Sequence, residues 1–404
     1  MRVSTVTIYN QSVSSLNRRQ TDFVETGQQI ASGKRVVRPS DDPQAAAQAL
    51  GVQQSKALVA QFQSARVGVR NALSQEESVL QSVGDAITRA RTLVLQASNG
   101  SLSDSDRASI ASELRGIHES VLGQANSADG NGRYLFGGLE DGSPPFVKDA
   151  AGAVAFVGVD EAREQRVDAS RLMAMADTGA SIFLSSHARG YVAEAPASNA
   201  GDVRFIGPSV VDTGASGYGN AFTLTFADDG AGGFTYHVED GDGVVYAADV
   251  PYVAGAPVRF AGLSLQLEGK PADGDVLRTG PGQAMNADLF QTFSKAIATL
   301  EAPADNNRSK AALNNTLNTV LRELDNSLDN VLIIGASVGA RLNELDTLDT
   351  VANARTLSYE QNLSDLVDLD YVKAVSDYTL RKVGLEAAQK AFVDVSSMSL
   401  FRML

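Results

Sequence analysis

Apolar residues recur at intervals of three and four along both ends of the chain, and this spacing most constrains its fold. Near the N-terminus the series comprises Val6, Tyr9, Val13, Leu16, Phe23 and Ile30, four of which lie seven residues apart. A matching C-terminal series comprises Tyr371, Tyr378, Leu385, Ala388, Phe392 and Val395. Such spacing places the apolar side chains on one stripe of a helix and predicts packing against another helix.

Two longer ladders of the same kind lie further inside the chain. One runs from Val59 to Ala97 and is interrupted only by Arg66 and Glu76, and the other runs from Leu317 to Leu345. They predict long helices over 59–97 and about 310–355.

Local signals mark where the first helices end and begin. Gly33, followed by Lys34 and Arg35, is typical of a helix C-terminus. Pro43 suits the first position of a new helix, and Asp42 can cap its free N–H groups.

A shorter helix is expected after Ser103 and Asp104, which offer another cap. Its apolar face consists of Ile110, Leu114, Ile117 and Val121. His118 lies off this face, so we expect it to point to solvent.

The middle of the chain has a different sequence pattern, with short runs in which apolar and polar residues alternate. Residues 222–226 and 234–238 alternate around the turn 228–233, which predicts a β-hairpin. We therefore predict a mainly α fold with an inserted antiparallel β domain, in which long coiled-coil-like helices from both chain ends pack together. The expected parts are terminal helices (1–42 with 363–404), a helical bundle (43–138 with 285–362) and an outer β-rich domain (139–284).

Composition narrows the possible functions. The chain has 34 Lys and Arg against 48 Asp and Glu, a net charge of −14 that argues against nucleic-acid binding. It has no cysteine and only three histidines, which leaves little material for zinc or imidazole chemistry. No apolar run is long enough for a membrane-spanning helix, and the N-terminus lacks the apolar core of a secretory signal peptide. We expect no cofactor, metal or membrane insertion.

Three motifs imitate catalytic or binding sites. Residues 335–339 fit the G-x-S-x-G nucleophile elbow around Ser337, but every histidine precedes Ser337 and the motif lies inside a helical ladder. Small residues that let a neighbour approach closely explain it better. Residues 27–34 depart from phosphate-loop spacing, and Asp240 and Asp242 are more typical of a turn than of a calcium loop.

The terminal stripes allow two interpretations. They can form an ordinary core within one chain, or they can be assembly surfaces for other subunits. Each stripe is thin, and a two-helix hairpin of this size is marginally stable, so we favour assembly.

Several motifs support this interpretation by resemblance. The segments are Ile30–Arg35, Pro39–Pro43, Ala45–Ala47, Tyr134–Gly138, Val338–Asn343, Gln389–Phe392 and Ser399–Leu404. They resemble the bacterial flagellar axial proteins, which are the flagellins and the hook-associated proteins, over about 1–140 and 285–404. The prolines at 39 and 43 resemble hook-associated members rather than flagellins.

The resemblance implies a non-enzymatic adapter that joins the hook, through the first hook-associated protein, to the flagellin filament. Such proteins leave the cell through the flagellar type III export apparatus and self-assemble into a ring. Their terminal helices pair with those of neighbouring subunits, so both terminal series above are expected at the subunit interface. An export chaperone is expected to bind Tyr371, Tyr378, Leu385 and Phe392 before export. A flagellin and, remotely, a secreted serine hydrolase using Ser337 are the alternatives.

Overall fold

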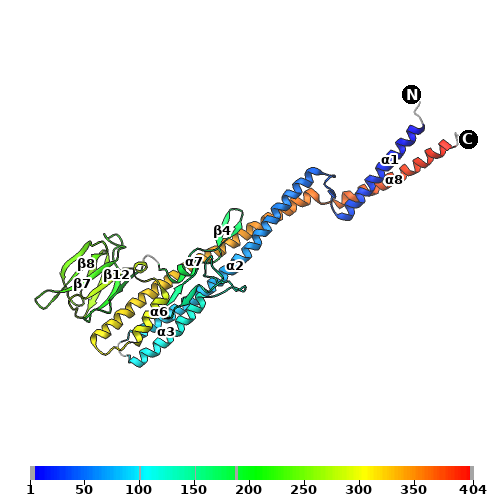
Figure 1. Cartoon of the computed structure of the whole chain (residues 1–404). Coiled ribbons are helices and arrows are strands. Elements are labelled where there is room, and N and C mark those ends of the chain that lie inside the picture. Colours follow the sequence, from blue (N-terminus) through cyan, green and yellow to red (C-terminus); the bar gives the residue numbers. More distant parts are fainter. Residues whose placement is uncertain (1–4, 100–101, 151, 187–189, 401–404) are drawn as a thin grey trace. The chain divides into compact units, whose positions relative to one another are not determined.

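The computed structural model describes the main chain of residues 5–99, 102–150, 152–186 and 190–400, and the side chains of residues 7 and 9–394 within these ranges (Figure 1). The helices are α1 (Thr5–Ser32), α2 (Pro43–Ala97), α3 (Asp104–Ala125), α4 (Gly179–Phe183), α5 (Gly282–Met285), α6 (Leu289–Glu301), α7 (Asn307–Val367) and α8 (Tyr371–Leu400). The strands are β1 (Phe146–Lys148), β2 (Val154–Phe156), β3 (Glu164–Asp168), β4 (Arg171–Ala174), β5 (Tyr191–Glu194), β6 (Arg204–Val210), β7 (Phe222–Asp228), β8 (Phe234–Asp240), β9 (Val245–Pro251), β10 (Pro257–Phe260), β11 (Leu263–Glu268) and β12 (Val276–Pro281). The predicted fold class is confirmed.

These elements form two compact units. We call Met1–Ser64 with Thr347–Leu404 the terminal unit and Ala65–Asp346 the central unit. α2 and α7 contribute residues to both. The division into inner, bundle and outer parts stays a prediction.

The helix ends follow the local sequence. Gly33 has a φ of +69°, the left-handed conformation that ends α1. Pro43 opens α2, and the N–H of Ala45 donates to Asp42 Oδ1 at 3.0 Å. α7 is longer than the predicted 310–355 because 356–367 contains neither glycine nor proline to stop it.

The long apolar ladders form the core of the central unit. Val69, Leu73 and Ile87 of α2 and Leu317, Val331 and Val338 of α7 are all buried. The charges of Arg66 and Glu76 suggest that these residues interrupt the core. Both side chains are instead buried within it. Arg66 Nη1 donates to the carbonyl oxygen of Val167 at 2.8 Å, and Glu76 Oε1 accepts the N–H of Asp177 at 3.0 Å.

The expectation that His118 faces solvent is wrong. Ser103 caps α3 as predicted, with reciprocal hydrogen bonds to Asp106. The apolar face of α3, however, extends to His118, whose ring is buried and packs edge-on against Phe290 and Phe293 of α6.

The β part consists mainly of two antiparallel sheets, with strand orders β5-β12-β7-β8-β9 and β10-β11-β6. β7 pairs with β8 in the predicted hairpin register, with Leu224 opposite Val238. Side chains from both sheets share one core, including Phe205, Phe222 and Leu265, so the sheets pack face to face.

Polar residues of α7 attach this β part to the helices. Asn315 accepts the N–H of Phe205 at 3.0 Å and donates to the carbonyl of Val203 at 2.8 Å. Thr319 Oγ1 donates to the carbonyl of Ala193 at 2.6 Å. Asn315 and Thr319 are buried, so hydrogen bonds to strand main chain satisfy these side chains where water cannot.

Candidate assembly surface

Two helix breaks shape the terminal unit and lie against each other. The N–H of Arg35 donates to the carbonyl of Val367 at 2.7 Å, and the N–H of Leu369 donates to the carbonyl of Gly33 at 3.0 Å. Asp370 Oδ1 then accepts the N–H of Val372 at 3.0 Å and so caps α8. Both chain ends therefore leave these breaks as new helices.

A carboxylate keeps the first break in place. Asp42 lies 3.1 Å from Arg35 Nη1 and caps α2. The N–H of Ala45 and then the Arg35 guanidinium lower the pKa of Asp42. The cap therefore stays charged at neutral pH.

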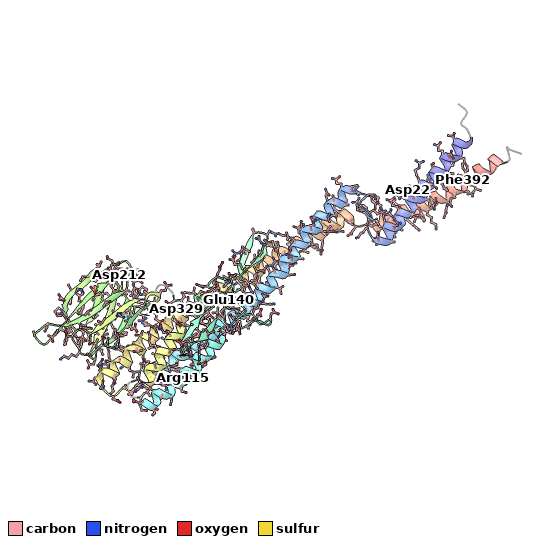
Figure 2. All side chains as sticks on the ribbon, viewed as in Figure 1. Asp22, Arg115, Glu140, Asp212, Asp329 and Phe392 are labelled. Carbon is pink, nitrogen blue, oxygen red and sulfur yellow. The ribbon has the colours of Figure 1, made fainter. Side chains whose placement is uncertain are left out.

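α1 and α8 lie side by side and run antiparallel (Figure 1). Tyr9 packs against Phe392 with ring centroids 5.5 Å apart, and Phe23 stacks on Tyr378 at 4.7 Å. Between these pairs Arg381 Nη1 donates to the carbonyl of Asp22 at 2.7 Å; Figure 2 labels Asp22 on α1 and Phe392 on α8. The two predicted apolar series are therefore brought together within one chain.

This pairing covers the predicted series only in part. Tyr9 and Tyr371 remain 50% and 53% exposed. The half-buried members are Val13, Leu16, Phe23, Ile30, Tyr378, Leu385, Ala388 and Phe392. The side chains of Val6 and Val395 lie outside the described residues.

A second set of apolar residues on α8 escaped the sequence prediction. Val372 is 85% exposed and Leu380 is 76% exposed, and the others are Val375, Val383 and Val393. Val375 and Val393 lie on a flank of α8, whereas at about 100° per residue Val372, Leu380 and Val383 lie on the side opposite Tyr378, Leu385 and Phe392. We call these last three apolar residues, Val372, Leu380 and Val383, the α8 outer face. A search for apolar residues outside the seven-residue series would have found them.

The motifs that imitate enzyme sites have structural explanations. Ser337 lies within α7, so no strand-to-helix elbow forms around it. Among the described residues of this chain no close neighbour is found, because outside the local backbone of α7 no atom lies within 4 Å of the position that a Cβ would take at Gly335 or Gly339. Asp240 Oδ1 accepts the N–H groups of Asp242 and Val244 and closes the β8–β9 turn, as predicted.

The described residues also bear on metals and membranes. Among them, no group of three or more His, Asp or Glu is placed to hold a metal ion. None of the helices in the described ranges is long and apolar enough to cross a bilayer.

Comparison with known proteins first defines the class. Residues 3–141 match the family of the bacterial flagellin N-terminal helical region. The B-type flagellin of Pseudomonas aeruginosa is 30% identical over 152 residues, which cover only 36% of this chain and 29% of that flagellin. The fold and its paired terminal helices are therefore those of a flagellar axial protein.

Matches over the whole chain narrow the class further. Flagellar hook-associated protein 3 of Escherichia coli is 33% identical over 404 residues, covering 100% of this chain and 99% of the relative. The crystal structure of the flagellar junction protein FlgL from Legionella pneumophila has a TM-score of 0.68 at 27% identity, covering 80% of this chain and 100% of that one. The chain belongs to the flagellar hook-associated protein 3 family.

Proposed function

We propose that this chain is the structural adapter between the flagellar hook and the flagellin filament. The observation that carries the proposal is a terminal unit whose paired helices keep apolar side chains in water, in a chain that matches hook-associated protein 3 over its whole length. Several exposed apolar side chains on two neighbouring helices are typical of a surface that another subunit covers.

The partners follow from this position in the flagellum. The chain self-assembles into a ring through α1 and α8, with both predicted terminal series at or beside the subunit contacts. One side of the ring contacts the first hook-associated protein, and the other side receives flagellin. The chain reaches this place through the flagellar type III export apparatus.

An export chaperone binds the α8 segment before assembly. Tyr378, Leu385 and Phe392 are half-buried against α1 in the folded chain. A chaperone that holds these residues therefore binds the chain while α8 is separated from α1. The α1–α8 pair forms only after release.

Deletion of the gene tests the adapter function. We expect cells with hooks but no filaments, and flagellin shed into the medium. Normal filaments on the deletion strain would contradict the proposal.

The same strain separates the adapter from the flagellin alternative. A flagellin deletion also removes filaments, but it leaves no flagellin to be shed. The purified chain should also fail to polymerise alone into long filaments, whereas a flagellin would do so.

A further inference from the structure

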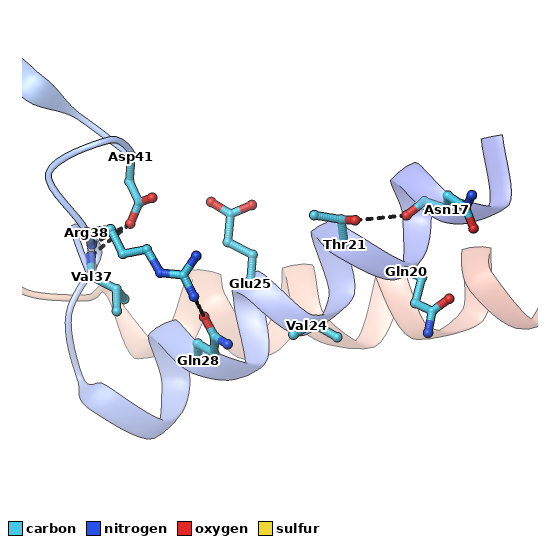
Figure 3. A pocket seen from close by; sticks show the side chains of 9 residues that line it. All are labelled: Asn17, Gln20, Thr21, Val24, Glu25, Gln28, Val37, Arg38 and Asp41. Atoms are coloured by element: carbon cyan, nitrogen blue, oxygen red, sulfur yellow. Dashed lines mark hydrogen bonds between the residues drawn. The ribbon is translucent and has the colours of Figure 1, made fainter. Parts of the chain in front are cut away.

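Two cavities of the chain have walls that are held in different ways. In the terminal unit, a cavity of about 580 Å³ lies between α1 and the connection to α2, where the exposed carboxylate of Asp41 accepts the N–H groups of Val37 and Arg38 (Figure 3). In the central unit, a cavity of about 430 Å³ lies between α2 and the loop after α3, and Met175 and Ala176 form part of its wall. A buried ionisable group holds this second wall.

The segment 174–178 connects β4 to α4 and is attached to both long helices. The N–H of Asp177 donates to Glu76 Oε1 of α2 at 3.0 Å, and Arg341 Nη1 of α7 donates to the carbonyl of Ala174 at 3.4 Å. The Asp177 carboxylate also pairs with the Arg341 guanidinium. Among the described residues, Glu76 and Arg341 are the partners on α2 and α7 to which this segment is hydrogen-bonded.

The carboxyl group of Glu76 lies where a negative charge is costly. Glu76 is fully buried, and its Oε2 accepts no hydrogen bond from the described residues. The guanidinium of Arg341 and the carboxylate of Asp177 both act on it, so one cation serves two carboxyl groups. Because the Asp177 side chain is 29% exposed, Glu76 is the one that keeps a proton, and its hydroxyl can donate to the Asp177 carboxylate.

We propose that protonated Glu76 holds the segment 174–178 on α2 and α7 as a pH-sensitive switch, which rising pH opens while the rest of the central unit stays folded. Opening removes Met175 and Ala176 from the wall of the cavity and widens it. The inference does not depend on the proposed function.

The direction of the switch follows from where Glu76 holds its proton more tightly. Burial, followed by the charge of Asp177, raises the pKa of Glu76 from 4.5 to about 8 while the segment is in place. Once the segment leaves, water reaches Glu76 and the carboxyl group loses its proton readily. Opening therefore becomes more favourable as pH rises from about 4.5 to 8, and it gains nothing further once both states are ionised.

Other charged groups near the cavity already have partners. Arg163 and Arg133 line the cavity and both pair with Asp141. Asp129 accepts main-chain N–H groups of its own loop, and Arg66, the second buried charged residue of α2, donates to the main chain of β3. A cation that balanced an ionised Glu76 would have to leave one of these contacts.

Amide hydrogen exchange of the full chain tests the switch. The protection of the Asp177 amide, corrected for the intrinsic pH dependence of exchange, should fall by up to about tenfold for each pH unit between 6 and 7.5. This amide should exchange well before those of Leu73 and Val83 in the core of α2. Glu76→Gln stays neutral and keeps an oxygen for the Asp177 N–H, so its protection should not change with pH. Glu77→Gln, at the exposed neighbouring position, is the matched control and should follow the parent.

Constant protection of the Asp177 amide across this pH range in the parent would overturn the switch, whatever the variants do. The same pH dependence in Glu76→Gln would overturn it too. Exchange of Asp177 only together with the core amides of α2 would show that the segment opens only when the whole unit unfolds, and this also contradicts the proposal. None of these results touches the adapter function, which the gene deletion tests separately.

Discussion

α7 and α8 follow each other in the chain but differ in what they leave exposed. α7 buries polar side chains at Asn315 and Thr319, and the main chain of the β part satisfies both. α8, by contrast, exposes apolar side chains at Val372 and Leu380, which are 85% and 76% exposed among the described residues. From this difference we expect α8 to depend on neighbouring subunits more than the part of α7 that holds the β part.

A charge introduced on the α8 outer face should have the largest effect. Val383 is 59% exposed, so Val383→Asp should change the stability of the free chain by less than about 0.5 kcal/mol. In the assembly the same carboxylate would be buried without a partner, which costs several kcal/mol. We expect the number of filaments per cell to fall at least about tenfold, counted by electron microscopy.

Gln389→Asp is the matched control for this experiment. Gln389 is also exposed on α8 but is not part of the apolar set. It should keep most filaments, and both variants should keep the far-ultraviolet circular dichroism of the parent. Wild-type filament numbers in Val383→Asp would contradict the claim that neighbours cover this face.

The second test concerns the buried carboxyl group of Glu76 in the central unit. Burial, followed by the charge of Asp177, raises the pKa of Glu76 to about 8. The folded chain therefore keeps a proton on Glu76 that the unfolded chain loses near pH 4.5. The free energy of unfolding should fall as pH rises from about 4.5 to 8, by on the order of 5 kcal/mol at most.

Glu76→Gln removes this titration while it keeps an oxygen for the N–H of Asp177. Denaturant unfolding at several pH values should show a flatter profile than the parent and a higher stability above pH 8. Glu77→Gln, at the exposed neighbouring position, should retain the parent profile. Equal pH dependence in the parent and Glu76→Gln would show that Glu76 ionises freely in the folded chain.

A third test removes one of the hydrogen-bonded attachments of the β part to α7. Asn315→Ala leaves the buried N–H of Phe205 and the carbonyl of Val203 without their partner, which should cost roughly 2–4 kcal/mol. Asn314→Ala removes only a hydrogen bond to Lys310 of the same helix and serves as the control. Amide hydrogen exchange at Phe205 should accelerate in the first variant alone. Unchanged exchange there would mean that the sheets hold their place without α7.

The sequence predicts the elements of both units better than their contacts. Periodicity was enough for the long helices, and capping residues such as Asp42 placed their ends. Periodicity could not show that Arg66 and Glu76 belong to the core, because their hydrogen-bond partners Val167 and Asp177 lie 101 residues further along the chain. It also missed Val383 on the α8 outer face, since a seven-residue series marks only one side of a helix.

The smallest expected effect concerns His118, the other buried titratable group where the sequence prediction was wrong. Burial lowers the pKa of His118, and Glu119, Lys148 and Asp288 are the charged groups that act on it. The unfolded chain therefore binds a proton more readily, so the free energy of unfolding should decline as pH falls below about 6.5. His118→Leu should weaken this acid-side decline, by less than the change at Glu76. His237→Leu, at a half-exposed position of β8, should retain it, and an equal decline in His118→Leu would assign the acid sensitivity to other groups.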